Sequence, residues 1–173
     1  MKPSGSFRRD RALDKDGKAR GKEAGSRAVR TELIRGIVID KRIKTPMHSS
    51  IASLLERTFT LQVPPEFCIR KDGALTLRDS EPEPDLAIVS GNHEDYFHAH
   101  PSTAALAVEV AVTSPDDDRA LAEIYAEAGV GAYWVVLPKE RAIEVARQPR
   151  DSPIAKCTAT SSRTRLCAAP CPA

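Results

Sequence analysis

Two acidic residues stand in apolar surroundings, and together they could bind a divalent cation. Glu109 lies in the middle of TAALAVEVAVTS, residues 103–114, which has the composition of a strand buried on both faces. Because side chains alternate along a strand, Glu109 shares its face with Ala107 and Ala111, whose small side chains leave room for a ligand. Asp85 begins the preceding apolar segment after a Pro-Glu-Pro sequence. If the two strands are neighbours, the two carboxylates converge.

Such a pair suits Mg²⁺ or Mn²⁺, because hard cations prefer oxygen ligands. Two carboxylates, a backbone carbonyl and waters can form the shell, and the ion can then activate a water and stabilise charge on a phosphate. In the alternative interpretation, Asp85 is a turn residue at a strand entry and Glu109 pairs with an Arg or Lys, since an uncompensated buried carboxylate is costly. The pattern alone leaves both interpretations open.

The composition restricts the class of protein. With 173 residues, 41% of them hydrophobic, the chain can bury one domain-sized core. No run approaches about 18 consecutive apolar residues, so no membrane span is expected. Cys68 stands alone, and the cysteines at 157, 167 and 171 lie outside any periodic segment. This distribution predicts free thiols in a reducing, cytoplasmic protein.

Charge is segregated along the chain. Residues 1–30 contain ten Lys/Arg and four Asp/Glu, whereas residues 31–146 contain 11 and 19. The acidic centre argues against a strong general affinity of the core for nucleic acid and suits carboxylates gathered around a metal. Residues 1–29 lack hydrophobic periodicity and are predicted to be a disordered basic tail that adds to DNA affinity. Residues 148–173 are predicted to be a disordered or aberrant C-terminal tail.

Hydrophobic periodicity predicts an α/β domain with a mixed sheet over residues 30–147. One helix should begin at the cap Thr45 and present Ile51, Leu54, Leu55, Thr58 and Phe59 on one face. A second helix should follow Ser114 and bury Leu121, Ile124, Tyr125 and Ala128. The predicted strands cover residues 32–40, 67–70, 74–77, 84–90, 105–112, 132–138 and 142–147.

The order of these segments resembles the Uma-two family of bacterial restriction endonucleases, in the PD-(D/E)xK nuclease superfamily. The similar stretches are RTELIRGIVIDK, KTPMHSSIASLL, EPEPDLAIV, ALAVEVAVTS and DDDRALAEIYAEAGVGAYWVV. The resemblance implies a restriction-endonuclease-like fold, a mixed β-sheet flanked by helices. It also implies that Asp85 and Glu109 are divalent-metal ligands and that Glu32 is a catalytic residue beside the cleft.

This sequence departs from the family at the expected lysine. The superfamily places it two residues after the glutamate, where Ala111 stands, and the resembling family places it on the following helix, where Leu121 stands. Lys41 or Lys44 could reach the cleft, but the sequence favours solvated surface lysines.

Two other polar residues are assigned ordinary roles. A helix-cap or surface role is favoured for His48. An i,i+4 pair with Glu123 is favoured for Arg119.

The leading hypothesis is therefore a Mg²⁺-dependent or Mn²⁺-dependent endonuclease acting on DNA phosphodiester bonds, with weak or absent cleavage because the lysine is missing. The alternative is a catalytically silent nuclease fold that serves as a binding or assembly module. A lysine near the metal would favour the first, and a cleft filled by Leu121 would favour the second. The sequence leaves the oligomeric state open, a homodimer included.

Overall fold

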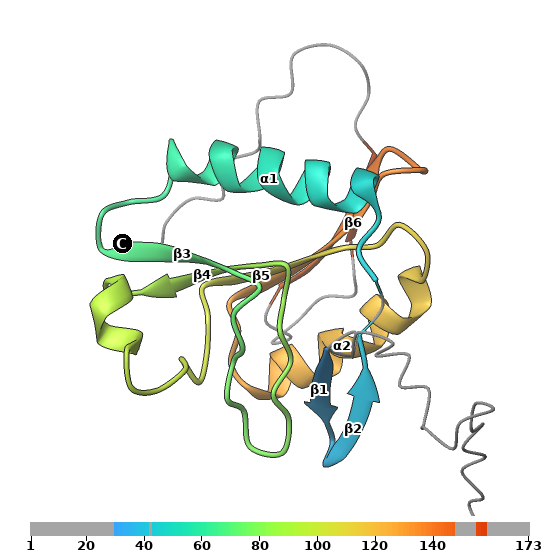
Figure 1. Ribbon diagram of the computed structural model, residues 1–173. Helices are drawn as coiled ribbons and strands as arrows, with labels where there is room; N and C mark the ends of the chain where they lie inside the picture. The colour runs from blue at the N-terminus through green and yellow to red at the C-terminus, as the bar shows by residue number, and fades with distance from the viewer. Residues whose placement is uncertain (1–29, 42, 148–154, 159–173) are drawn as a thin grey trace, which may run out of the picture.

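A six-stranded mixed sheet forms the centre of the protein (Figure 1). The computed structural model describes residues 30–41 and 43–147, and the backbone alone of residues 155–158. The strand order is β3-β4-β5-β6-β7-β8, in which β5 and β6 are parallel and every other neighbouring pair is antiparallel. The strands are β3 (Phe67–Lys71), β4 (Leu86–Ser90), β5 (Leu106–Val110), β6 (Ala132–Leu137), β7 (Ala142–Arg147) and β8 (Ala155–Thr158). This is the mixed α/β architecture that the sequence predicts.

Helix α1 (Pro46–Thr60) covers one face of the sheet. Thr45 caps it as predicted, since its hydroxyl accepts a hydrogen bond from the backbone N–H of His48. Ala52 and Phe59 are buried against the even-numbered residues of β5, and Phe59 meets Trp134 edge to face at 5.9 Å. Leu54 is 63% exposed, so its predicted place on the buried face is wrong. The buried stripe is centred on Ala52 instead.

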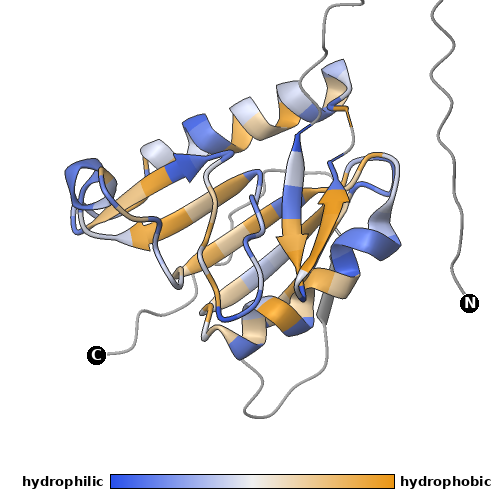
Figure 2. Cartoon of the chain, turned by 60° about the horizontal axis from the view of Figure 1, so that its bottom comes forward, coloured by the Kyte–Doolittle hydropathy of each residue, from blue (hydrophilic) through white to orange (hydrophobic). Residues whose placement is uncertain are grey.

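A two-stranded sheet, β1 (Thr31–Ile34) and β2 (Ile37–Asp40), stands apart from the main sheet. The sequence predicts one strand here, but Arg35 and Gly36 both have positive φ and turn the chain into a hairpin. Figure 2 shows apolar colouring on this hairpin, where Ile37 and Val38 are more than half exposed.

The predicted strand at residues 74–77 is also absent. Leu75 is fully buried there in irregular structure, which explains the misleading apolar pattern.

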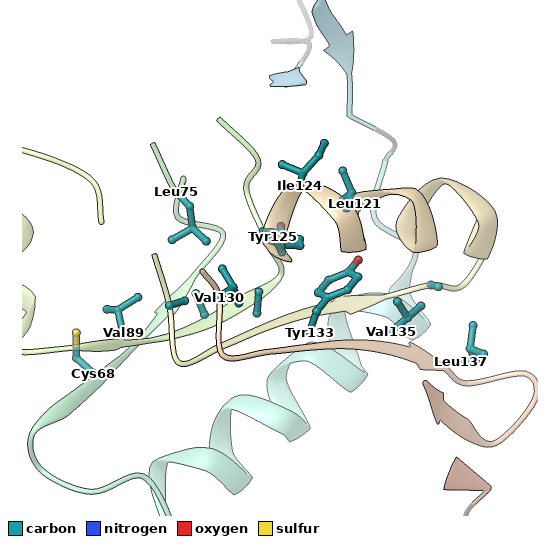
Figure 3. Close-up of a cluster of buried hydrophobic side chains, with 14 of the residues drawn as sticks. Cys68, Leu75, Val89, Leu121, Ile124, Tyr125, Val130, Tyr133, Val135 and Leu137 are labelled. Atoms are coloured by element: carbon teal, nitrogen blue, oxygen red, sulfur yellow. The ribbon is translucent and has the colours of Figure 1, made fainter. Parts of the chain in front are cut away.

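Helix α2 (Pro115–Glu127) joins the parallel strands β5 and β6 and covers the opposite face of the sheet. Leu121, Ile124 and Tyr125 are buried, as predicted, and Gly129 follows the helix with a φ of 72°. Figure 3 shows these side chains packed over the sheet beside Tyr133 and Val135. The α2 side is therefore the face toward which odd-numbered residues of β5 point.

The predicted hairpin of β6 and β7 is confirmed, and it is extended by a strand that the sequence did not suggest. Ala155–Thr158 pairs with β7, so the expectation of an unstructured C-terminal region fails for these four residues. The rest of that region and the basic segment 1–29 lie outside the described residues. Within the described ranges, no helix has the length and apolar character needed to cross a membrane.

Candidate active site

Asp85 and Glu109 meet on the α2 face of the sheet, as their spacing predicts. Leu86 pairs with Val108, and Ala87 with Ala107, so Asp85 falls beside Glu109 on the adjacent strand. The backbone N–H of Asp85 donates to the Glu109 carboxylate at 3.4 Å. Ala107 and Ala111 point to the same side and belong to the core cluster under α2. The alternation of the two strands therefore brings the two carboxylates together.

Glu109 is a buried acid with weak compensation. Its side chain accepts hydrogen bonds from the Tyr125 hydroxyl and from the Asp85 backbone, both at 3.4 Å, which is the long end of the range. Burial raises the pKa of Glu109 well above its usual range, and the neighbouring charge of Asp85 raises it further. A cation beside Glu109 would relieve both effects.

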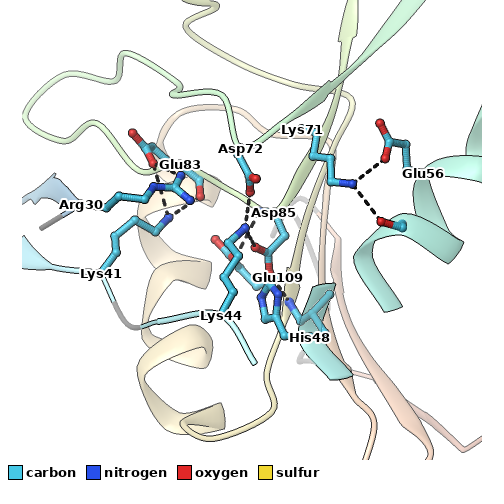
Figure 4. Close-up of polar contacts among 12 residues, drawn as sticks. Arg30, Lys41, Lys44, His48, Glu56, Lys71, Asp72, Glu83, Asp85 and Glu109 are labelled. Atoms are coloured by element: carbon cyan, nitrogen blue, oxygen red, sulfur yellow. Dashed lines mark hydrogen bonds and ion pairs between the residues drawn. The ribbon is translucent and has the colours of Figure 1, made fainter. Parts of the chain in front are cut away.

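Asp85, in contrast, is surrounded by donors (Figure 4). Its Oδ1 accepts from the Lys44 ammonium at 2.7 Å, and its Oδ2 lies 2.7 Å from Nε2 of His48. The backbone N–H of Val110 also donates to Oδ2 at 2.8 Å, where the β4–β5 ladder has ended. Burial alone would raise the pKa of Asp85, but the hydrogen bonds from Lys44 and Val110 outweigh it and hold the pKa below the usual value.

Glu32, on β1, forms a second polar cluster at the edge of the same cleft. Its Oε2 lies 3.2 Å from the Lys41 ammonium and accepts a hydrogen bond from the Glu83 backbone N–H at 3.2 Å. Lys41 also donates to the Glu83 carbonyl at 2.5 Å. The structure thus brings Glu32 to the same cleft as Asp85 and Glu109, beside a lysine that the sequence placed in solvent.

A cavity of about 340 Å³ connects these groups. It is lined by the acidic residues Glu32, Asp40, Asp85, Glu109, Asp117 and Asp118, by Lys41, Lys44 and His48, and by apolar residues that include Leu121. Burial, followed by the charge of Asp85, raises the pKa of Asp118 from 3.8 to about 6. The excess of carboxylates gives the cavity the electrostatic character of a cation site.

Three of these lining residues were assigned other roles from the sequence, and Lys44 was named only as a less favoured candidate for the cleft. Lys44 directly precedes Thr45, the cap of α1, His48 lies in the first turn of α1, and Asp118 lies in the first turn of α2. Local rules assigned them to solvent, to a cap and to the helix dipole. The one feature of the sequence that could have pointed to them is their position near the N-termini of two helices that follow strands. The sequence does not show that packing brings these two N-termini to the same cavity.

Leu121 faces both the cavity and the core. It is 9% exposed, belongs to the cluster under α2, and lines the cavity at the position where the resembling family has its lysine. Arg119, two residues earlier, does not make the predicted pair with Glu123. Its guanidinium instead binds Glu144 of β7 through two hydrogen bonds of 2.7 and 2.8 Å. Arg119 is therefore held away from the carboxylates of the cavity.

The donor chemistry fits a hard cation. Within the described residues, no three or more His, Cys, Asp or Glu side chains already form a metal-ligating cluster. Two adjacent carboxylates with weak compensation at Glu109 nevertheless supply the oxygen ligands that Mg²⁺ and Mn²⁺ prefer, with waters completing the shell. Lys44 and His48 currently hold the Asp85 oxygens that such an ion would share.

The fold and the family together define the class of this protein as nuclease-like. Its structure is similar to a crystal structure from Anabaena variabilis ATCC 29413, titled a "putative nuclease belonging to DUF820", with a TM-score of 0.64 and 18% identity. The match covers 72% of this chain and 75% of that one, and it supports the predicted restriction-endonuclease-like fold.

Residues 23–166 match the Uma2 family, described as "Putative restriction endonuclease", and the chain belongs to this family, as its sequence resemblance predicts. No curated protein matches the sequence.

Proposed function

We propose that this protein is a metal-dependent endonuclease that hydrolyses DNA phosphodiester bonds. The observation that carries the proposal is the contact between Asp85 and Glu109 on adjacent strands of a nuclease-like fold, within one acidic cavity. Both carboxylates would hold Mg²⁺ or Mn²⁺, and Glu32 would assist from the edge of the cleft. The ion, when bound, supplies charge stabilisation at the phosphate and lowers the pKa of a bound water.

The reaction is a hydrolysis that needs no other reactant. The oxygen of water forms a bond to phosphorus, the bond from phosphorus to the leaving sugar oxygen breaks, and the leaving oxygen takes up a proton while the water releases one. Glu109 and Asp85 fix the position at which the phosphate is attacked. Behind the cavity wall, Tyr125 of α2 packs against Tyr133 of β6 with ring centroids 4.7 Å apart, and this buried contact would hold the helix against the sheet.

We propose DNA as the substrate because basic residues near the acidic cleft can bind the phosphates of a polyanion. Lys41 and Lys44 lie at the cavity, and the segment 1–30 carries ten Lys/Arg against four Asp/Glu. Phosphate neutralisation by such residues releases counterions and gives affinity that falls with salt.

A second candidate is a catalytically silent nuclease fold that serves as a binding or assembly module. The specific observation in its favour is that both oxygens of Asp85 are already hydrogen-bonded, to Lys44 on one side and to His48 and Val110 on the other. Leu121 also fills part of the cavity wall. In this case the ion pair would be structural, and the protein would not respond to divalent ions.

Plasmid nicking with the full chain distinguishes the two candidates. Supercoiled DNA is incubated with the wild type and with Glu109→Ala and Asp85→Asn, in EDTA, Mg²⁺ or Mn²⁺. Nicking that requires the ion and is lost in both variants supports the endonuclease. Glu56→Gln is the matched control, because Glu56 pairs with Lys71 outside the cavity. Ion-independent nicking, or nicking that survives both substitutions, would refute the proposal.

A further inference from the structure

We infer that Lys44 supplies the positioning cation that the lysine-free positions 111 and 121 lack. This inference rests on the proposed endonuclease function and assigns a residue that the family pattern does not. The observation is that the Lys44 ammonium lies 2.7 Å from Oδ1 of Asp85 inside the acidic cavity. A lysine within hydrogen-bonding distance of a metal-ligand carboxylate stands where an attacking water and a phosphate oxygen must approach.

Lys44 is held in place from two directions. It directly precedes Thr45, the cap of α1, so the start of the helix fixes its backbone. Its ammonium also pairs with the carboxylate of Asp72, a residue in a turn with a φ of 53° after β3. The backbone N–H of Asp72 donates to the Asp85 carbonyl at 3.3 Å. Asp72 therefore keeps the ammonium at the cleft when Oδ1 of Asp85 takes a different partner.

Lys41, the other lysine at the cavity, is less suited to this role. Its ammonium is directed to Glu32 at 3.2 Å and to the Glu83 carbonyl at 2.5 Å, and the Glu83 carboxylate lies 4.0 Å away. These partners hold Lys41 at the β1–β2 side of the cleft, whereas Lys44 contacts Asp85 itself. Lys41 therefore organises Glu32, and Lys44 organises the metal-ligand pair.

Lys44 is expected to affect ion binding and turnover in opposite directions. Without a divalent ion, its charge compensates Asp85 and competes with an ion for Oδ1. With an ion bound, the ammonium stays paired with Asp72, keeps its proton, and donates hydrogen bonds to the attacking water or to a phosphate oxygen. Removing Lys44 should therefore strengthen ion binding and at the same time slow turnover. A lysine with a purely structural role would not separate these two quantities.

The experiment compares wild type, Lys44→Met and Lys44→Arg, using Mn²⁺ titration calorimetry and steady-state nicking of plasmid DNA. For Lys44→Met we expect kcat to fall about 100-fold, with KM for DNA changed less than about threefold, while Mn²⁺ binds more tightly. Lys44→Arg should retain part of kcat because it retains the charge. Lys71→Met, which breaks the Glu56 pair outside the cavity, should match the wild type in both measurements.

Relocation of the lysine provides the decisive comparison. Leu121→Lys in the Lys44→Met background should restore a substantial part of kcat, because Leu121 lines the same cavity. If Lys44→Met unfolds, the double variant Lys44→Met/Asp72→Asn is used in its place, because it also removes the Asp72 carboxylate that Lys44 pairs with. Unchanged kcat in Lys44→Met or in that double variant, or weaker Mn²⁺ binding in step with a lower melting temperature, would overturn the inference.

The inference can fail separately from the proposed function. Nicking that needs Mg²⁺ and Glu109 but not Lys44 refutes only the role of Lys44. Absence of ion-dependent nicking by the wild type refutes both.

Discussion

Replacing Asp118 with Asn is expected to raise the free energy of unfolding of the metal-free protein at neutral pH. Asp118 lies in the first turn of α2 and lines the cavity that also contains Asp85 and Glu32. Burial is the main cause that raises its pKa from 3.8 to about 6, and these two carboxylates add to it. At pH 7.5 the folded protein therefore carries an ionised group in an unfavourable place. The neutral amide removes that cost.

The magnitude follows from the size of the pKa change. A pKa that moves from 3.8 to about 6 corresponds to about 3 kcal/mol of unfavourable free energy for the ionised form. Asp118 is only partly buried, so solvent screening reduces this figure. The carboxylate also interacts favourably with the N-terminus of α2, which subtracts up to about 1 kcal/mol from the gain. A net stabilisation of about 1–2 kcal/mol is expected.

The sign of the pH dependence distinguishes this cause from a packing effect. Between pH 4 and pH 6 the folded wild type keeps a proton on Asp118 that the unfolded chain has released, so its stability falls relative to Asp118→Asn as the pH rises. The difference should be close to zero at pH 4 and constant above about pH 7. Urea unfolding in EDTA, followed by the fluorescence of Trp134, measures it at both ends.

Asp117→Asn is the matched control, because Asp117 lies in the same helical turn but is exposed. It loses the same helix-dipole interaction and relieves no burial of its own, but it removes one of the charges that raise the pKa of Asp118. Its stability should therefore change much less than that of Asp118→Asn. A stabilisation of Asp118→Asn that is equal at pH 4 and pH 7.5 would refute the electrostatic reasoning, as would destabilisation at pH 7.5.

Three further changes test other parts of the site. Glu109→Gln should raise the melting temperature of the metal-free protein at pH 8 and abolish stabilisation by Mg²⁺, which for wild type is about 1.4 kcal/mol at ten times Kd; a Mg²⁺ effect that persists would place the ion elsewhere. Arg119→Ala should lower the urea midpoint of unfolding, since it removes both hydrogen bonds that the guanidinium donates to the buried Glu144 carboxylate, and an unchanged midpoint would contradict this. Leu121→Lys in the wild-type background should lower stability by roughly 1–3 kcal/mol and raise Mg²⁺-dependent nicking, a gain that Glu109→Ala must remove.

The part of the site that could be predicted from sequence consists of residues on strands. Asp85 and Glu109 follow from period-two alternation, which is a local property, together with the tendency of successive strands to be neighbours. The cap at Thr45 and the buried stripe of α2 are local in the same sense. Their metal-binding and catalytic roles remain predictions.

The errors of sequence interpretation share one cause: rules based on neighbouring residues take no account of tertiary contacts. An i,i+4 rule pairs Arg119 with Glu123, yet β7 lies under α2 and offers the better-desolvated Glu144. Glu123 lies instead 3.7 Å from Arg35 of the hairpin turn. The apolar pattern around Leu75 indicates a strand, but burial there comes from irregular structure.

The sequence by itself determined the alternating strands, the two amphipathic helices and the pair of carboxylates, because these depend on steric and hydrophobic periodicity over a few residues. Only the tertiary structure decided which basic side chains contact those carboxylates. Lys44 and His48 reach Asp85 across 41 and 37 residues of sequence, since α1 and the end of β2 pack beside the open end of the β4–β5 ladder. No local rule covers that distance, because the position of a loop lysine follows from the order of strands and the faces that the helices cover.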